Sequence, residues 1–347
     1  MKVDIFDFNL PNNLIAEKSA SPRDSSRMLL VSGSSLSDKC IGNLSDVFSA
    51  GDLFVINNTR VLSSRLRGKV NNYSVEVTFL NEVKKGIWRS LVKPAKRLSI
   101  GDSFFFSDYK IKVFKKEIRG EVLFEVNMDK TKFIELLLKK GEMPLPPYLK
   151  NNKMKNPFED YQTIFAKKYG AVACPTAGLH FTPDLINILK DKGINVLEIT
   201  LHVGSGTFLP LKGKDTKSHR MHEEFFEISK KTASAINYAK KSGRKIIAVG
   251  TTVLRALESS VDVNGDIKSK KGFTNIFITP EEKILTTDYL LTNFHLPKST
   301  LFILVCAYAG VRIMHNAYVH AIRNKYRFYS LGDACLIKKN IANDTII

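Results

Sequence analysis

The densest cluster of side chains able to do chemistry is the run His219-Arg220-Met221-His222-Glu223-Glu224. A histidine beside a carboxylate can be held in one tautomer and tuned for proton transfer, so His222 with Glu223 predicts acid–base chemistry. The run lacks the HExxH spacing that places two imidazoles on one helical face, and it therefore does not predict a zinc site. An exposed loop whose charges are simply solvated is the alternative for this run taken alone.

Four further segments combine glycine with threonine, histidine and asparagine. Glycine lets the backbone approach a ligand closely, and hydroxyl, amide and imidazole groups can orient it. One such segment is more often a turn or a helix cap, but four at equivalent positions favour a binding site beyond the carboxyl ends of strands. The segments are Cys174–His180, His202–Phe208, Val249–Thr252 and Thr292–Pro297.

Two common nucleotide-binding motifs are absent from the sequence. Gly204-Ser205-Gly206 begins like a dinucleotide-binding loop, but Leu209 stands where the third glycine is required, which excludes that motif. The sequence also has no GxxxxGK[ST] run to hold a nucleoside triphosphate.

Two carboxylates call for a structural partner. Glu198 lies inside an apolar strand and needs a partner if it is buried. Glu258 lies one helical turn from Arg255 and is expected to pair with it.

The secondary-structure elements that must position these residues follow two different sequence patterns. From Asp52 to about Asn127 apolar and polar residues alternate, as at Val75, Val77 and Phe79, and short runs are separated by glycine-containing turns. This pattern predicts a small antiparallel sandwich or barrel. A helix over about 131–140 follows, and the prolines of 144–147 predict an interdomain linker.

After these prolines, strands and helices alternate, which predicts an α/β domain. Thr182 and Ser229 are expected helix N-caps, with Gly193 and Gly243 as stops, and Ser299 lies in the first turn of a third helix. The β-rich stretch is therefore expected to be an insertion. Residues 1–60 and 146–347 would form the main α/β domain, with the active-site loops in its second part, and residues 61–145 the inserted all-β domain.

The 347 residues carry 53 Lys and Arg against 34 Asp and Glu, a formal net charge of +19. The first 50 residues are nearly neutral, so the excess belongs to the rest of the chain. A field of this sign favours nucleic acid as a partner, and solvated lysines of a lysine-rich proteome are the alternative.

Targeting signals are not evident. Asp4 and Asp7 stand where a signal peptide would be apolar, and the longest apolar run, Leu301–Val311, is too short to span a bilayer. The four cysteines are far apart with no CxxC pair, which fits reduced thiols. A cytoplasmic protein without a membrane partner is expected.

Nine segments, in order from near the N-terminus to near the C-terminus, resemble the S-adenosylmethionine:tRNA ribosyltransferase-isomerase family of queuosine biosynthesis. They are PRDSSRMLLV (22–31), GDLFVINNTRVLSSRLRG (51–68), GEMPLPPYL (141–149), YQTIFAKKYGAVACPTAGLHFT (161–182), TLHVGSGTF (200–208), HRMHEEFFEI (219–228), IAVGTTVLRALES (247–259), TDYLLTNFHLPKSTL (287–301) and YRFYSLGDACLI (326–337). Departures are local: Asp160 stands where an arginine commonly precedes the YQT run, and Cys306 where a small residue is usual.

The resemblance implies a fold and a reaction. The fold would be α/β, a barrel-like main domain with an inserted small antiparallel all-β barrel. The reaction would transfer and isomerise the ribosyl group of S-adenosylmethionine onto 7-aminomethyl-7-deazaguanine at the wobble position of tRNA. Epoxyqueuosine would form, with adenine and methionine released. No metal or redox cofactor is expected, because the reaction is redox-neutral and S-adenosylmethionine is consumed as a co-substrate.

Such a reaction needs a base to remove a 5′-methylene proton, which the sulfonium makes acidic, and an acid to protonate departing adenine. His202 and His222 are expected to transfer protons, with Glu223 orienting them or acting as the base. Phe208 or Phe294 is a candidate to face the sulfonium. The residues expected to contact S-adenosylmethionine are Thr176, Gly178, His180, Gly204, Gly206, Thr207, Thr251, Thr252, Asn293 and His295.

The expected partners are S-adenosylmethionine and the anticodon loop of tRNA, whose reacting base must be splayed out. The chain is expected to act as a monomer. Each basic residue taken singly is more often merely solvated. The candidates for phosphate contact are Arg60, Arg65, Arg67, Lys93, Lys96, Arg97, Lys212, Lys214 and Lys217.

Two other functions are weighed against this one. An RNA methyltransferase would use the same S-adenosylmethionine, but its usual glycine-rich loop near the N-terminus is missing. A non-catalytic tRNA-binding protein would keep only the scaffold, and the intact His, Thr and Gly positions of the four segments argue against it.

Overall fold

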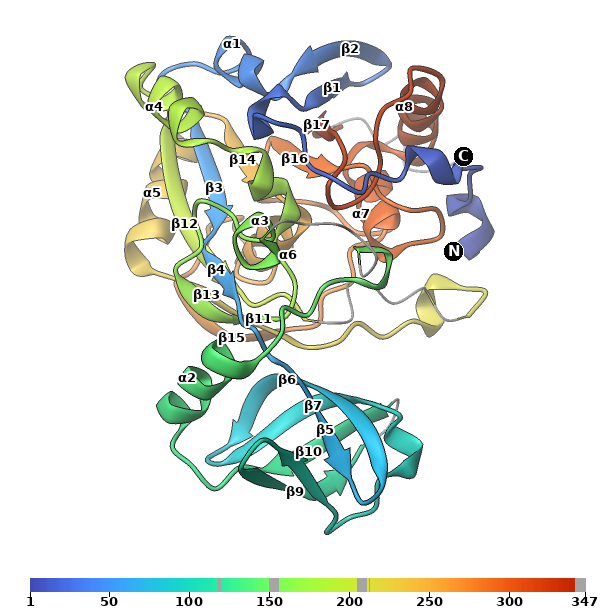
Figure 1. Cartoon of the computed structure of the whole chain (residues 1–347). Helices are drawn as coiled ribbons and strands as arrows, with labels where there is room; N and C mark the ends of the chain where they lie inside the picture. The colour runs from blue at the N-terminus through green and yellow to red at the C-terminus, as the bar shows by residue number, and fades with distance from the viewer. Residues whose placement is uncertain (118–119, 150–155, 205–210, 212, 341–347) are drawn as a thin grey trace.

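The chain folds around one large mixed sheet, with a separate closed barrel beside it (Figure 1). The computed structural model describes residues 1–117, 120–149, 156–204, 211 and 213–340. In spatial order the nine strands of the large sheet are β15 (Lys270–Thr274), β13 (Glu224–Ile228), β12 (Asn195–Leu201), β3 (Leu53–Asn57), β14 (Ile246–Val249), β16 (Tyr289–Asn293), β17 (Ala334–Lys338), β1 (Arg27–Ser32) and β2 (Ser35–Cys40).

The middle of this sheet is parallel, since β12, β3, β14 and β16 run side by side in the same direction. Every residue of β3 and β14 is buried, as expected for parallel strands with both faces covered. The helices of the main domain are α1 (Leu44–Val47), α3 (Pro157–Asp160), α4 (Pro183–Asp191), α5 (Lys230–Lys241), α6 (Thr251–Glu258), α7 (Thr300–Ala309) and α8 (Val311–Arg323).

The expected helix starts are confirmed by their caps. The Thr182 hydroxyl accepts the Leu185 amide at the start of α4, and the Ser229 hydroxyl accepts the Thr232 amide at the start of α5. Ser299, placed in the first turn by the sequence pattern, is the N-cap of α7 and accepts the amide of Phe302. These caps fix where the loops at the carboxyl ends of the strands finish.

The barrel contains six antiparallel strands in the order β10, β7, β6, β5, β8 and β9. Val75, Val77 and Phe79 of β6 point inward, as their alternation predicts, and all three are buried. A helix, α2 (Lys130–Lys140), packs Phe133 against Phe79 and Trp88 with ring centroids 4.9 Å apart in both pairs. The strands are β5 (Arg65–Val70), β6 (Tyr73–Lys84), β7 (Ile87–Lys93), β8 (Ser103–Phe106), β9 (Tyr109–Lys116) and β10 (Glu121–Glu125).

Two chain segments connect the barrel to the main domain, and they pair with each other. The short strand β4 (Thr59–Val61), which pairs with β11 (Lys168–Ala171), leads into the barrel. On the return, the Glu142 amide donates to the Arg65 carbonyl at 2.8 Å, and the Arg65 amide donates to the Glu142 carbonyl at 3.2 Å. The barrel strands and α2 thus occupy 65–140, inside the range of 61–145 expected for the insertion.

The predicted fold class, α/β with an inserted antiparallel barrel, is confirmed. The main domain differs in detail from the barrel-like form that the resemblance implies. Its sheet ends at β15 and β2, and no pairing closes these two strands among the residues described.

Within the described ranges, no single helix is both long enough and apolar enough to cross a membrane. Helices α7 and α8 meet that test of length and composition only as a pair, and a bend of 115° separates them. Nearly all of α7 is buried inside the main domain.

Candidate active site

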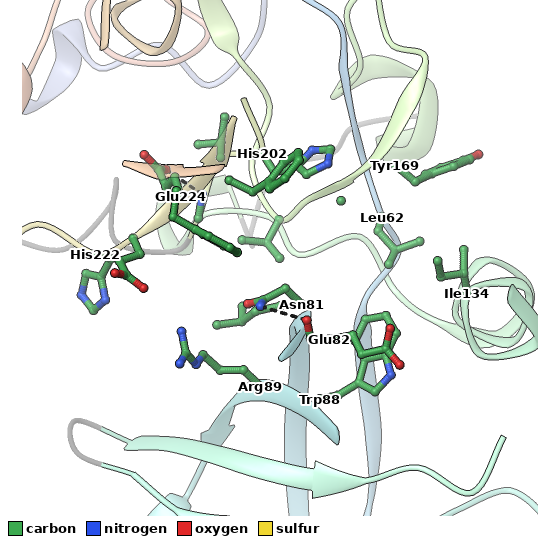
Figure 2. Close-up of a pocket in the computed structure, with 18 of the residues that line it drawn as sticks. Leu62, Asn81, Glu82, Trp88, Arg89, Ile134, Tyr169, His202, His222 and Glu224 are labelled. Carbon is green, nitrogen blue, oxygen red and sulfur yellow. Dashed lines mark hydrogen bonds between the residues drawn. The ribbon is translucent and has the colours of Figure 1, made fainter. Parts of the chain in front are cut away.

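A cavity of about 420 Å³ lies where the barrel meets the main domain (Figure 2). Figure 2 shows Asn81, Trp88 and Arg89 on the barrel side of this space and His202 and Glu224 on the opposite side. The barrel, with α2, contributes Leu80, Asn81, Glu82, Trp88, Arg89, Glu121, Lys130 and Ile134. The main domain and the segments joining it to the barrel contribute Leu62, Tyr169, Gly170, Val172, His202, Val203, Gly204, His222, Glu223, Glu224, Phe225, Glu227, Lys271 and Phe273.

His202 is the most tightly held of the three predicted catalytic residues. It directly follows β12, and its Nδ1 lies 2.8 Å from the Thr59 hydroxyl. One face of the imidazole stacks on Phe225, with centroids 5.4 Å apart and an interplanar angle of 23°. A Cβ at Gly170 would lie 2.6 Å from the ring, and Gly170 has φ +151°, so only glycine fits there without displacing the histidine.

Burial controls the charge of this histidine. Removal from solvent lowers the pKa of His202 to about 4, and the positive charge of Lys168 lowers it further, while Glu227 opposes the shift. His202 is therefore neutral at physiological pH. Among the described residues its Nε2 forms no hydrogen bond, so this nitrogen is free to exchange a proton with a ligand.

His222 and Glu223 lie in the segment just before β13, at the wall that faces the barrel. His222 Nδ1 is 3.7 Å from the Glu121 carboxylate of β10, which is also 3.6 Å from Arg89 Nε. Glu223 lines the same cavity and is exposed. No hydrogen bond joins His202 to His222 or Glu223 in the part of the chain described, so the three share one cavity without direct contact.

Glu224 holds the backbone beside the cavity. It forms a buried ion pair with Arg255 of α6, and its second oxygen accepts the Gly204 amide at 2.8 Å. The expected pairing of Arg255 with Glu258 is wrong. The Glu258 carboxylate instead accepts from the amides of Leu285 and Thr286 and from the Thr286 hydroxyl, and burial raises the pKa of Glu258.

The reason is geometric. Arg255 is turned toward β13, whereas Glu258 at the end of α6 faces the chain at 285–286, so spacing along one helix does not decide the partner. Glu198 is half-buried, so the condition set for a partner is not met in full, but its carboxylate accepts from Asn58 Nδ2 at 3.1 Å and pairs with Lys167.

The segments predicted to bind S-adenosylmethionine meet around a second, smaller cavity of about 50 Å³. The Thr176 hydroxyl donates to Asn293 Oδ1 at 2.9 Å, and the Thr292 hydroxyl lies 3.1 Å from His295 Nε2. Val203 lines both cavities, so they are neighbours. The predicted ligand-binding residues on the small cavity are Thr176, Thr251, Thr252, Asn293 and His295.

The remaining members of that predicted set lie elsewhere. His180 is buried behind Asn293, with its Nε2 3.1 Å from Asn293 Nδ2, and burial lowers the pKa of His180 to about 4. Gly178 is buried against Thr163, and Gly204 lines the large cavity. Burial also lowers the pKa of His295 to about 3. Gly206, Thr207, Phe208 and Lys212 lie outside the described residues.

The aromatic candidate Phe294 does not face a ligand. It is fully buried in the main core against Phe328 and Tyr318 and lines neither cavity. The aromatic side chains at the large cavity are Trp88, Tyr169, Phe225 and Phe273.

The predicted phosphate-contacting residues divide into those with ionic or aromatic partners near the junction between the domains and exposed ones that form no ion pair within the described residues. Arg67 forms hydrogen bonds of 3.0 Å to both oxygens of Glu142, and Arg65 lies 3.4 Å from Glu76. The half-buried Arg60 stacks over the rings of Tyr169 and Phe158. The exposed members are Lys93, Lys96, Arg97, Lys214 and Lys217. In the first group only Arg67 is exposed, and its guanidinium is engaged by Glu142 and Glu76.

The sequence did not predict that residues of the barrel, such as Trp88 and Arg89, line the cavity. Trp88 is the only tryptophan of the chain and stands next to Arg89 in β7, and its alternating pattern predicts a strand but not a ligand site. A lone tryptophan beside a cation in an alternating strand is the one signal that could have suggested a ligand. No group of three or more His, Cys, Asp or Glu side chains in the described ranges is placed to hold a metal ion.

Comparisons with known proteins agree on one family. The family model described as "Queuosine biosynthesis protein" matches residues 3–337. A protein of Beijerinckia indica named S-adenosylmethionine:tRNA ribosyltransferase-isomerase is 44% identical, with 99% of this chain and 98% of that protein covered. A protein of Methylocella silvestris with the same name is 46% identical, with 97% and 98% covered.

A solved structure is similar as well. The crystal structure of an S-adenosylmethionine tRNA ribosyltransferase from Thermotoga maritima is 30% identical and superposes with a TM-score of 0.56. The match covers 96% of this chain and 99% of that one.

Proposed function

The chain belongs to the queuosine biosynthesis protein family of S-adenosylmethionine:tRNA ribosyltransferase-isomerases, and we propose that the cavity between its two domains is where that reaction occurs. The enzyme transfers and isomerises the ribosyl group of S-adenosylmethionine onto 7-aminomethyl-7-deazaguanine at the wobble position of tRNA. Family and full-length relatives support this function over a methyltransferase or a non-catalytic tRNA-binding protein.

The observation that carries the location is the position of the predicted catalytic residues. His202, His222 and Glu223 come from two separate segments, and all three line the one cavity of about 420 Å³. This volume lies within the usual range for small-molecule sites. The small cavity of about 50 Å³ has room for only a few atoms.

The charges of the large cavity suit its proposed substrates. The sulfonium of S-adenosylmethionine and the aminomethyl group of the base are both cationic, and carboxylates stabilise such groups. Of the five glutamates in the lining, four are already engaged, whereas Glu223 has no hydrogen-bonded or ion-paired partner among the described residues. Glu223 is therefore available to face a substrate cation.

His202 is suited to the proton transfer nearest the ribosyl group. Burial keeps the imidazole neutral, and in the tautomer whose Nδ1 donates to the Thr59 hydroxyl, Nε2 can accept a 5′-methylene proton from S-adenosylmethionine at physiological pH. The lowered pKa also makes the resulting imidazolium a stronger acid than that of an ordinary histidine, and it can give the proton to departing adenine. We assign the second proton transfer to His222, which lies beside Glu121 at 3.7 Å.

The smaller cavity is proposed to receive one end of S-adenosylmethionine. Its threonine hydroxyls and the Asn293 amide can form hydrogen bonds with polar atoms, and Val203 connects its wall to the larger cavity. The sulfonium and C5′ would then lie near His202. Metal and redox cofactors play no part in the proposal, since the transfer is redox-neutral, and the chain is proposed to work as a cytoplasmic monomer.

One assay tests this function. The full chain is incubated with S-adenosylmethionine and tRNA carrying 7-aminomethyl-7-deazaguanine, and released small molecules and nucleoside mass are measured. Adenine plus methionine, with the mass of epoxyqueuosine in the tRNA, is expected. Release of S-adenosylhomocysteine would instead indicate a methyltransferase, and tRNA binding without any release would indicate a non-catalytic binder.

A further inference from the structure

The outer surface of the barrel exposes several aromatic side chains that do not pack in its core. Four of the seven large aromatic residues exposed in the described chain belong to the barrel strands: Tyr73, Phe105, Tyr109 and Phe114. Exposure of aromatic side chains to water is unfavourable, and several of them on one face commonly mark an interaction site. Two of these, Phe105 and Phe114, each 50% exposed, share a face.

Strand alternation places both on the outside of the barrel. Phe104 and Phe106 of β8 are buried, so Phe105 between them points outward. On β9, Ile111 and Val113 are buried, so Lys110, Lys112 and Phe114 point outward.

The register then sets lysines beside Phe105. Phe105 lies opposite Lys69 on β5 and opposite Lys110 on β9. Lys110 Nζ lies 5.9 Å from the centroid of the Phe105 ring. We call Lys69, Phe105, Lys110, Lys112 and Phe114 the aromatic–basic face.

The lysines of this face are free to meet an anion. In contrast to Arg65 and Arg67, none of Lys69, Lys110 and Lys112 is ion-paired within the described residues, and all three are exposed. Residues 65–125 as a whole carry fourteen Lys and Arg against seven Asp and Glu. Glu125, opposite Lys112 on β10, is the acidic neighbour.

The strand β9, which carries Lys110, Lys112 and Phe114, ends beside a residue that lines the large cavity. Figure 1 shows β9 next to β10 along the edge of the barrel. The end of β9 pairs Lys116 with Val122, and the Glu117 amide donates to the carbonyl of Glu121, a residue that lines the cavity. A chain that delivers a base to the cavity could therefore continue along β9.

We propose that the aromatic–basic face binds the anticodon-loop nucleotides that flank the reacting base, with bases stacked on Phe105 and Phe114 and phosphates beside the three lysines. Alternating aromatic and cationic side chains are the surface that proteins use for single-stranded nucleic acid, because every base has a π-face and every link a phosphate. The proposal rests on the proposed function, which supplies tRNA as the partner.

Matched variants of the full chain test the lysines. Binding of tRNA carrying 7-aminomethyl-7-deazaguanine is measured between 50 and 200 mM salt for Lys69→Gln/Lys110→Gln/Lys112→Gln. The control, Lys230→Gln/Lys231→Gln/Lys241→Gln, removes the same charge from exposed positions of α5. Loss of three single-strand phosphate contacts should make the negative slope of log K against log salt shallower by about 2. The control should leave the slope unchanged.

A second pair of variants tests the stacking. Phe105→Leu/Phe114→Leu keeps apolar bulk without an aromatic face, and Tyr238→Leu changes an aromatic side chain that is 76% exposed on α5. The Phe variant should weaken tRNA binding about tenfold or more with an unchanged salt slope. Its KM for tRNA should rise by a similar factor, while its KM for S-adenosylmethionine stays at the wild-type value.

The outcomes separate the two proposals. Face variants that bind tRNA within twofold of the wild type, with the same salt slope, would overturn the aromatic–basic face, and so would an equal loss in the α5 controls. Wild-type chain that binds tRNA through this face but releases no adenine would overturn the proposed function and leave the face standing.

Discussion

At the scale of single residues, the structure explains how one half-buried histidine can be held neutral and still have, among the described residues, a free nitrogen at the cavity. Thr59 holds Nδ1 of His202 at 2.8 Å, Phe225 covers one ring face, and Gly170 leaves room for the ring itself. The imidazole is thus fixed in direction before a substrate arrives. Such fixing matters because a misplacement of about 1 Å can cost a hundredfold in rate.

Replacement of Thr59 tests this role. Thr59→Val keeps the shape of the buried side chain but removes the hydroxyl, so kcat should fall about ten- to hundredfold with little change in the KM for S-adenosylmethionine. Thr59→Ser keeps the hydroxyl and should stay within about threefold of the wild type. Steady-state adenine release measures both, and equal kcat values for the two variants would remove Thr59 from the account.

The same residue predicts a pH dependence. Because the pKa of His202 is lowered to about 4, its neutral base form persists well below pH 6.5. The acid limb of kcat/KM should therefore lie nearer to pH 4 than to the ordinary histidine value of about 6.5. A limb at 6.5 or above would show that a solvated group, and not His202, is the base.

At the scale of elements, α2 joins the barrel to its own core and to the cavity. Phe133 is fully buried between Phe79 and Trp88, while Lys130 and Ile134 of the same helix line the cavity. The packing that stabilises the barrel thus also sets one wall of the active site.

Truncation of Phe133 tests whether this packing stabilises the barrel and shapes the cavity. Phe133→Ala should lower the free energy of unfolding of the barrel by about 3–5 kcal/mol, as is usual for a buried phenylalanine, and should raise the KM for substrates. Lys132→Ala, on the exposed side of α2, should change the free energy of unfolding by less than about 0.5 kcal/mol. Urea unfolding monitored through the single tryptophan, Trp88, reports on the barrel directly.

At the scale of the whole molecule, the sequence predicts the individual strands and helix caps better than the cavity between the barrel and the main domain. Local signals such as the alternation at Val75–Phe79 and the caps at Thr182 and Ser229 depend on neighbouring residues, and the structure confirms them. The cavity depends on how the barrel docks, so no local pattern shows that Arg89 and Glu121 face His222. The pairing of Arg255 with Glu224 fails to follow from spacing for the same reason.

Two buried histidines and the half-buried His202 make the whole fold sensitive to acid. Burial lowers the pKa of His180 and His202 to about 4 and of His295 to about 3, from an ordinary value of 6.5. Between these values and 6.5 the unfolded chain binds protons that the folded chain does not, so the free energy of unfolding decreases as the pH falls through this window.

Each of the two most buried histidines, His180 and His295, should contribute a loss of about 2 kcal/mol between pH 7 and pH 5. Urea unfolding at the two pH values measures the loss. His180→Gln should show a smaller loss than the wild type. A wild-type free energy of unfolding that is the same at both pH values would contradict the neutral, buried state of these residues.

The central claim is that the ribosyl group reacts in the cavity between the barrel and the main domain. A crystal structure of the full chain with S-adenosylmethionine bound tests it most directly. The ribose C5′ is predicted to lie in this cavity, about 3–3.5 Å from His202 Nε2, with one end of the molecule toward Thr176 and Asn293. S-adenosylmethionine bound elsewhere, with its C5′ out of reach of His202, would contradict the account.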